Sequence, residues 1–164
     1  MATNERFMPV APEAIFDALT DSGGYGYWVV GSKLIRDVDD NWPEPGSAFH
    51  HKVGVGPLTI DDHSTVVEAK RPSLFRLRVK GRPAGTAIVT LEMHACPADG
   101  GTLVRFSENP DGLFGWLSLN PATHLFTLAR NAESLARLEE LALVQADEHD
   151  PAGPPAARSR RATT

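Results

Sequence analysis

The sequence predicts an α+β fold in which a curved antiparallel sheet of about seven strands packs against one long C-terminal helix. Three observations lead to this fold class. Several short segments in the middle of the chain alternate apolar and polar residues, as half-buried strands do. Turns rich in proline and glycine separate these segments, which favours neighbouring antiparallel strands. After Pro121, apolar residues recur at helical spacing to about Val144.

The first part of the chain predicts one strand and two short helices. The strand covers Glu5–Val10. The first helix opens at Pro12 and Glu13, because proline is tolerated at the first helical position and a glutamate complements the positive helix end. Its apolar stripe consists of Ile15, Phe16 and Leu19. A second short helix is predicted at Tyr25–Val30.

The middle of the chain predicts six strands. They cover Lys33–Asp39, Ser47–Val55, Leu58–Ala69, Leu74–Lys80, Ala84–Ala95 and Thr102–Glu108. Phe75, Leu77 and Val79 alternate with charged residues, as expected for a sheet with one solvated face. The strand Leu58–Ala69 alternates poorly, and a β-bulge explains such a break in the pattern.

Length and composition indicate one domain at residues 1–144 and a disordered tail at residues 145–164. The tail is polar and proline-rich, and it ends in the basic run Arg158-Ser-Arg-Arg. The net charge of −5 gives no reason to expect binding to nucleic acid or to an anionic membrane. The lone Cys96 excludes an intrachain disulfide. Without a signal sequence or an apolar run of ~20 residues, we expect a soluble, cytoplasmic protein.

Several local motifs, in this order along the chain, resemble the START/SRPBCC superfamily, whose fold is that of the birch pollen allergen. They are Val10-Ala11-Pro12 with Ile15-Phe16-Asp17-Ala18-Leu19, Trp28 on the second short helix, Gly46 before a strand, Val66-Val67-Glu68 with Arg71-Pro72, Gly101-Thr102-Leu103-Val104, and Arg130-Asn131 followed by Ser134-Leu135 and Arg137-Leu138. Within the superfamily the chain resembles the polyketide cyclase/dehydrase-like branch.

The resemblance covers roughly residues 5–143 and implies a helix-grip fold with a small, mainly apolar cavity between the sheet and the last helix. Members of the superfamily include ligand carriers, cyclases and dehydratases. The resemblance therefore implies a fold and a cavity rather than one reaction.

Strand parity selects two candidates for proton transfer, His51 and Glu108. His51 shares one face of its strand with Phe49, while Lys52, which prefers water, lies on the other face. Glu108 lies on the face opposite Arg105 and points inward or to the cavity rim. A cyclase or dehydratase needs such groups to move protons. The alternative is that His51 is a hydrogen-bonded interior histidine and Glu108 ends its strand in water.

The predicted ligand contacts are the inward-facing residues of the strands and of the helices that close the cavity. They are Trp28, Phe49, Phe75, Leu77, Val89, Leu91, Val104, Phe106, Phe126, Leu128 and Asn131. Phe126 and Trp28 are expected at the cavity mouth. The Asn131 amide is able to bind a ligand carbonyl, or else it satisfies a backbone group.

The sequence predicts no metal site and no cofactor. None of its histidines has the helical spacing of a zinc site, and adjacent strand residues such as His50 and His51 point to opposite faces. Asp61, Asp62 and His63 are either brought near the site by the bulge or form a solvated edge.

Three functions remain open at this point. The first is binding of a small hydrophobic or aromatic molecule, lipid-like or polyketide-like, in an internal cavity. The second is a polyketide cyclase/dehydratase-type enzyme, a lyase or isomerase, that uses His51 and Glu108. The third is a module that binds a chaperone or another protein through an exposed apolar patch. Leu113–Leu117 supplies such a patch, a cavity lid or the contact of a homodimer.

Overall fold

The protein is a single curved sheet that holds a long helix against one face. A computed structural model describes residues 1–30, 32–55, 58–81, 85–111 and 121–149, and within them it does not describe the side chains of residues 32–36, 51–55, 58–62, 81 and 149. The strands are β1 (Ala2–Met8), β2 (Ser32–Val38), β3 (Ala48–Val55), β4 (Leu58–Lys70), β5 (Leu74–Gly81), β6 (Gly85–Cys96) and β7 (Gly101–Asp111). The helices are α1 (Pro12–Thr20), α2 (Tyr25–Trp28) and α3 (Pro121–His149).

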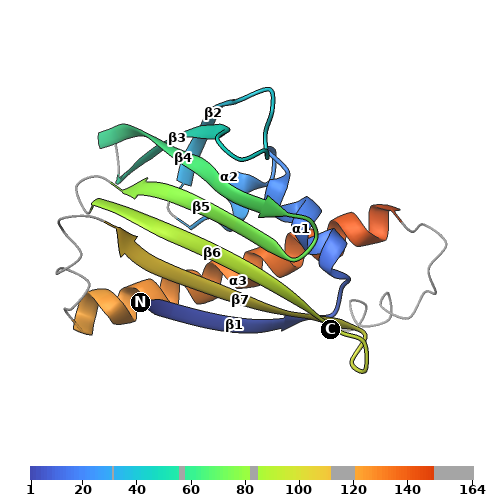
Figure 1. Ribbon diagram of the computed structural model, residues 1–164. Helices are drawn as coiled ribbons and strands as arrows, with labels where there is room; N and C mark the ends of the chain where they lie inside the picture. The colour runs from blue at the N-terminus through green and yellow to red at the C-terminus, as the bar shows by residue number, and fades with distance from the viewer. Residues whose placement is uncertain (31, 56–57, 82–84, 112–120, 150–164) are drawn as a thin grey trace, which may run out of the picture.

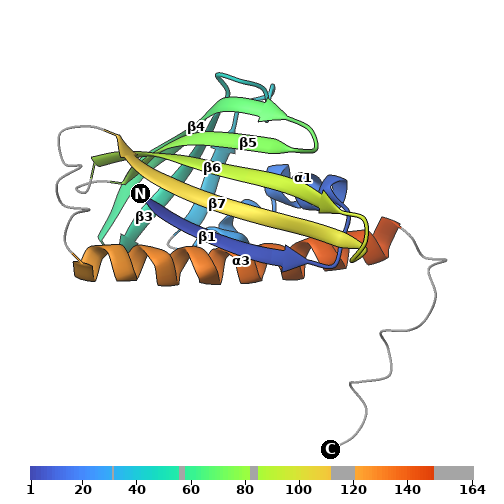
Figure 2. The same cartoon turned by 60° about the horizontal axis from the view of Figure 1, so that its bottom comes forward.

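The predicted helix-grip architecture is confirmed by the strand order and by the place of the last helix. The sheet order is β1-β7-β6-β5-β4-β3-β2, and every neighbouring pair is antiparallel. The first strand therefore pairs with the last one, and α1 and α2 connect the two edges of the sheet. Figures 1 and 2 show α3 running along one face of the sheet.

Several predicted boundaries differ from the structure, and the largest differences are at the start of β1, at the end of β7, which continues past Glu108 to Asp111, and at the end of α3. Strand β1 begins at Ala2 rather than Glu5, because its pairing with β7 satisfies the backbone of residues that show no apolar alternation. Helix α3 continues past Val144 to His149, so residues 145–149 belong to the helix and not to the predicted tail. The Gln145 side chain donates a hydrogen bond to Asp21 at 3.2 Å, a long-range partner that composition does not reveal.

Strand β4 has a bulge, but it lies at Val67 and not beside Asp61–His63, where the pairing with β3 is regular. Val66 pairs with Leu77 and Glu68 with Arg76, so Val67 is the extra residue against β5. Val66 is 2% exposed, whereas Val67 is 41% exposed. The bulge explains why two successive valines, an unfavourable pattern for a regular half-buried strand, occur here.

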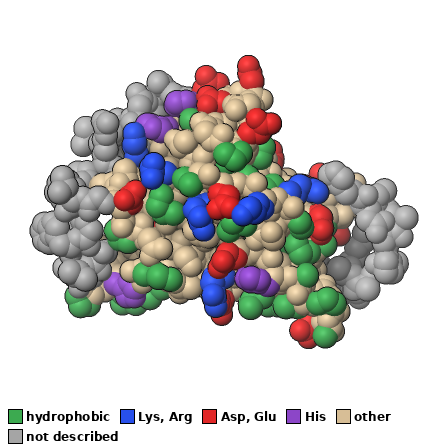
Figure 3. Space-filling model, in the orientation of Figure 1, with side chains coloured by type: hydrophobic (Ala, Val, Ile, Leu, Met, Phe, Trp, Pro, Cys, Tyr) green, Lys and Arg blue, Asp and Glu red, His purple; other side chains and the backbone are tan. Residues whose placement is uncertain are grey.

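The outer face of the sheet is covered by charged side chains in pairs. Arg76 contacts Glu68 at 2.9 Å and Arg105 contacts Glu5 at 2.7 Å across neighbouring strands. Figure 3 shows this face, with basic and acidic side chains interspersed. Because long charged side chains remain hydrated there, the opposite face is the one that has to be buried.

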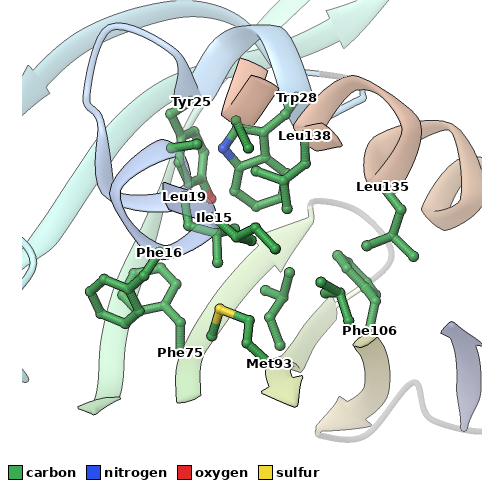
Figure 4. Packing of buried hydrophobic residues seen from close by; sticks show 14 of the residues in the cluster. Ile15, Phe16, Leu19, Tyr25, Trp28, Phe75, Met93, Phe106, Leu135 and Leu138 are labelled. Carbon is green, nitrogen blue, oxygen red and sulfur yellow. The ribbon is translucent and has the colours of Figure 1, made fainter. Parts of the chain in front are cut away.

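The buried face carries an aromatic cluster at the end of the sheet near α1 and α2. The rings of Tyr25 and Phe49 lie 4.0 Å apart, and those of Phe16 and Phe75 lie 5.9 Å apart. Trp42 lies 5.6 Å from Phe49, and its indole nitrogen donates to the Thr20 carbonyl at 2.8 Å. Figure 4 shows these helices packing their apolar side chains onto the sheet and α3. Close aromatic packing of this kind fills the interior at the end near α1 and α2.

The Gly101-Thr102 motif joins the start of β7 to the end of β1. A Cβ atom on Gly101 would lie 2.4 Å from the Met8 carbonyl oxygen, so no larger residue fits without a shift of the backbone. The buried Thr102 hydroxyl donates to the Val10 carbonyl at 2.8 Å. The motif therefore fixes the corner from which α1 starts.

Replacing Phe75 by alanine should destabilise the protein far more than the same change at Phe126. Phe75 is 0% exposed and Phe126 is 70% exposed. We expect Phe75→Ala to lower the free energy of unfolding by about 3–5 kcal/mol and Phe126→Ala by less than about 0.5 kcal/mol. Urea denaturation of both variants measures this, and similar losses would contradict the packing described above.

Stability should fall at high pH because of Tyr25. Burial raises the pKa of Tyr25 from its ordinary value of 10.0 to about 12, and the hydrogen bond to Ser64 opposes this rise. Since the pKa is higher in the folded state, this contribution to stability is complete below about pH 10 and is lost as the pH rises to about 12, at a cost of roughly 2–3 kcal/mol. The measurement is the free energy of unfolding of the wild type and of Tyr25→Phe between pH 10 and pH 12. The two curves should converge or cross, because only the wild type loses this contribution. Parallel curves would show that Tyr25 does not cause the loss.

Candidate functional site

Two polar residues, Asn131 and Ser134, are buried on α3, and the Ser134 hydroxyl accepts a hydrogen bond from the Val30 backbone N–H at 3.3 Å. Leu135, Leu138 and Ala142 are buried to within 1% of complete, as the helical spacing predicts. Asn131, one turn before Leu135, is equally buried, with 0% of its surface exposed. An asparagine in this position has to find hydrogen-bond partners inside the protein, which makes its surroundings the candidate site.

Arg130 orients the Asn131 amide. Its Nε and Nη2 atoms donate to Asn131 Oδ1 at 3.3 Å and 3.1 Å, and Nη2 also donates to Glu108 Oε2 on β7. A guanidinium group has donors only, so the amide oxygen turns toward it and the amide nitrogen turns away. Asn131 Nδ2 is buried and has no hydrogen-bond partner in the described part of the chain. A buried donor without a partner costs about 1–3 kcal/mol, so this position suits an acceptor from a ligand or a water molecule.

Two further buried polar atoms are without partners among the described residues. Asn4 on β1 donates its Nδ2 to the Leu128 carbonyl at 3.1 Å, but its Oδ1 has none. The indole nitrogen of Trp28, a residue 2% exposed, has none either. These atoms come from β1 and α2, so the interior presents unsatisfied polar groups from elements on either side of α3 as well as from α3 itself.

A surface cleft lies where β1, β7 and the first turns of α3 meet. Its volume is about 280 Å³, part of which is open to solvent. The polar lining residues are Glu108, Thr123, His124 and Thr127, and the apolar ones are Met1, Ala2 and Pro110. The Glu108 side chain is 15% exposed. Glu108 therefore contacts the cleft and also, through Arg130, the buried Asn131.

Most of the predicted ligand contacts lie together in one buried cluster. Its members among them are Trp28, Phe49, Phe75, Leu77, Val89, Leu91, Val104 and Phe106, each at most 6% exposed. Leu128 is half-buried, while the Phe126 side chain is on the surface. Figure 4 shows Phe106 of β7 facing Leu135 of α3.

Of the two predicted proton-transfer residues, the structure describes the side chain of Glu108 but not that of His51. Glu108 lines the cleft and pairs with Arg130. The backbone of His51 pairs with Ile35 and Asp62, but its side chain lies outside the described part of the structure, as do those of Asp61 and Asp62.

The described His63 ring lies 6.0 Å from the His50 ring, and His50 Nε2 is 3.8 Å from Asp39. No group of three histidine, cysteine, aspartate or glutamate residues in the described ranges is arranged to hold a metal ion.

Sequence reasoning missed Arg130 and His124 as parts of the site. His124 is one of the residues that line the cleft beside Glu108. Arg130 contacts a partner 22 residues earlier in the chain, on a different element. The signals were the Arg130-Asn131 motif and the helical spacing of His124, Leu128 and Asn131. Neither indicates which residues of the sheet lie next to them.

The proposed apolar patch at Leu113–Leu117 lies outside the described residues, so the interaction module and the homodimer stay predictions. Just after this segment, Leu125 and Phe126 are 68% and 70% exposed. Among the described helices, none is long and apolar enough to cross a membrane.

Comparison with known proteins identifies relatives of the fold. A family model described as polyketide cyclase / dehydrase and lipid transport matches residues 2–142. No curated protein matches the sequence. A protein of unknown function from Staphylococcus aureus has a similar structure, with a TM-score of 0.69, 11% identity, and coverage of 89% of this chain and 94% of the other.

Two other solved structures are also similar. Ara h 8.0201 has a TM-score of 0.62 at 14% identity, with coverage of 87% of this chain and 96% of that one. The Aha1 dimer from Colwellia psychrerythraea has a TM-score of 0.62 at 14% identity, with coverage of 88% and 96%. At these identities the structural matches show a shared fold and nothing more.

The Glu108–Arg130 pair should couple more strongly than an exposed ion pair. The side chains of Glu108 and Arg130 are 15% and 33% exposed, whereas those of Glu5 and Arg105 are 45% and 50% exposed. Double-mutant cycles with Glu108→Gln and Arg130→Met, and with Glu5→Gln and Arg105→Met, measure each coupling. We expect about 1.5–3 kcal/mol for the first and about 0.2–1 kcal/mol for the second. Equal couplings would mean that Arg130 is not held by Glu108.

Proposed function

Because the chain belongs to the polyketide cyclase / dehydrase and lipid transport family, we propose that it binds a small hydrophobic or aromatic molecule in an internal cavity between its sheet and α3. The observation that carries this proposal is the buried Asn131 amide, whose nitrogen has no partner in the described structure. The ligand is mainly apolar and has one hydrogen-bond acceptor, such as a carbonyl oxygen, that meets Asn131 Nδ2.

Orientation of the amide supports this role. An unrestrained asparagine is able to turn and present either its oxygen or its nitrogen. Here Arg130 holds the oxygen with two N–H donors, and Glu108 in turn holds Arg130. The donor is therefore fixed before a ligand arrives, so little ordering is required on binding.

The residues next to Asn131 suit an apolar ligand body. Leu135 lies one turn further along α3 and is 1% exposed, and Phe106, two residues before Glu108 on β7, is 5% exposed. Ligand sites in proteins commonly combine such apolar walls with a few convergent polar groups. Phe106 and Leu135 would contact the ligand body while Asn131 fixes one polar atom.

The second candidate function is proton transfer on the bound molecule. A carboxylate next to a carbonyl-binding amide is the arrangement that a cyclase or dehydratase needs, and Glu108 and Asn131 share the same Arg130 nitrogen. His51 remains the proposed second group. Native mass spectrometry of the protein from its own host, with release of the bound molecule, supplies the compound for a turnover assay. Retained binding with lost turnover in Glu108→Gln would favour the enzyme.

The affinity for a ligand with a carbonyl group should depend on the Asn131 donor, and two probes that differ only in that group test this. Benzophenone and diphenylmethane have nearly the same shape, but only the first has a carbonyl. We expect the wild type to prefer benzophenone by about tenfold, the effect of one buried hydrogen bond. Asn131→Asp keeps the shape and the contact with Arg130 but lacks the donor, so it should lose this preference and still bind diphenylmethane. Asn131→Leu should do the same.

Calorimetric or NMR titration measures these affinities. If the wild type bound neither probe, binding of an apolar ketone would be excluded. If it bound both equally, Asn131 would not be the donor.

A further inference from the structure

The cleft beside Glu108 is not explained by binding of an apolar ligand. A pocket for a whole drug-sized ligand typically has roughly 300–1,000 Å³, whereas the comparable volume of this cleft is about 40 Å³. Its lining contains a carboxylate, an imidazole and two hydroxyl groups, from Glu108, His124, Thr123 and Thr127. A cleft of this size and polarity suits a small polar end group rather than an apolar body.

The cleft and the buried amide are close to each other. Arg130 Nη2 donates both to Glu108 Oε2, which belongs to the cleft, and to Asn131 Oδ1 in the interior. The Arg130 Nη2 atom therefore lies between the carboxylate oxygen of Glu108 and the side-chain amide of Asn131. Glu108 and Asn131 therefore contact the same guanidinium group, one from the cleft and the other from the interior.

The two positions offer opposite hydrogen-bonding chemistry. Asn131 Nδ2 is a donor and requires an acceptor from the ligand, while a carboxylate such as Glu108 accepts hydrogen bonds only. The Thr127 hydroxyl donates to the Thr123 carbonyl at 2.9 Å, so its oxygen is also left to act as an acceptor toward the cleft. At the Glu108 and Thr127 oxygens the cleft therefore suits a group that donates hydrogen bonds.

We propose that the cleft is a second subsite of the same ligand site, which binds a hydroxyl group of a hydroxy-carbonyl compound whose carbonyl oxygen is held by Asn131. This inference rests on the proposed function and deepens it. On the cleft side, the Glu108 carboxylate accepts a hydrogen bond from the ligand hydroxyl. Arg130 donates a hydrogen bond to the same carboxylate from the opposite side. A carbonyl compound without a hydroxyl binds through Asn131 alone, and more weakly.

The test compares para-hydroxybenzophenone with para-methoxybenzophenone, which differ by one hydrogen-bond donor. We expect the wild type to bind the hydroxy compound about tenfold more tightly, since hydrogen bonds to a charged acceptor are the stronger ones. Glu108→Gln should reduce this advantage, measured as the ratio of the two affinities within the same variant, to less than about threefold, because the neutral amide is a weaker acceptor for the ligand hydroxyl than the carboxylate. Glu133→Gln, which removes the same charge at an exposed position of α3, should keep the full advantage.

A second measurement does not depend on the folding of a variant. In the wild type, the hydroxy compound should shift the backbone amide resonances of Thr123, His124 and Thr127 more than the methoxy compound does.

Equal affinities of the two compounds, or no shifts at these residues, would overturn the second subsite and leave ligand binding through Asn131 intact. If no ketone bound at all, the proposed function would fail and the subsite with it.

Discussion

Burial of the α3 stripe against the inner face of the sheet is the interaction on which the other features depend. Leu135, Leu138 and Ala142 have almost no exposed surface, and they face the apolar residues of β5, β6 and β7. Neither layer is stable alone, because each would leave one apolar face in water. Once the two layers meet, the chain between β1 and β2 has to cover the remaining apolar face, and α1 and α2 do so with aromatic rings.

The two halves of this interface differ in chemistry, and that difference positions the candidate site. Near α1 and α2 the aromatic cluster fills the space between the layers. Toward the start of α3, polar groups lie among the apolar ones: Asn4, Asn131 and the Glu108–Arg130 pair occur beside Phe106 and Leu135. A polar group inside a protein destabilises it unless it is paired. The nitrogen of Asn131 has no partner among the described residues, and this is the reason for placing the proposed ligand there.

Glu108 has a different part in this arrangement from the one that strand parity suggests. Parity predicts an inward or rim carboxylate available for proton transfer. The structure adds an arginine from α3 as its partner, which makes Glu108 a residue that positions Arg130 and, through it, Asn131.

The sequence alone determined the fold class, the strand and helix order, and the faces on which Phe75, Leu77, Glu108 and Asn131 lie. It did so because apolar periodicity, turn residues and parity are local properties of the chain. The extension of α3 to His149, the pairing of β1 from Ala2, the Glu108–Arg130 contact and the approach of His124 to the cleft were decided by tertiary structure. Each of these joins residues on different elements, and such distances are set by how the sheet and helix pack and not by any local pattern.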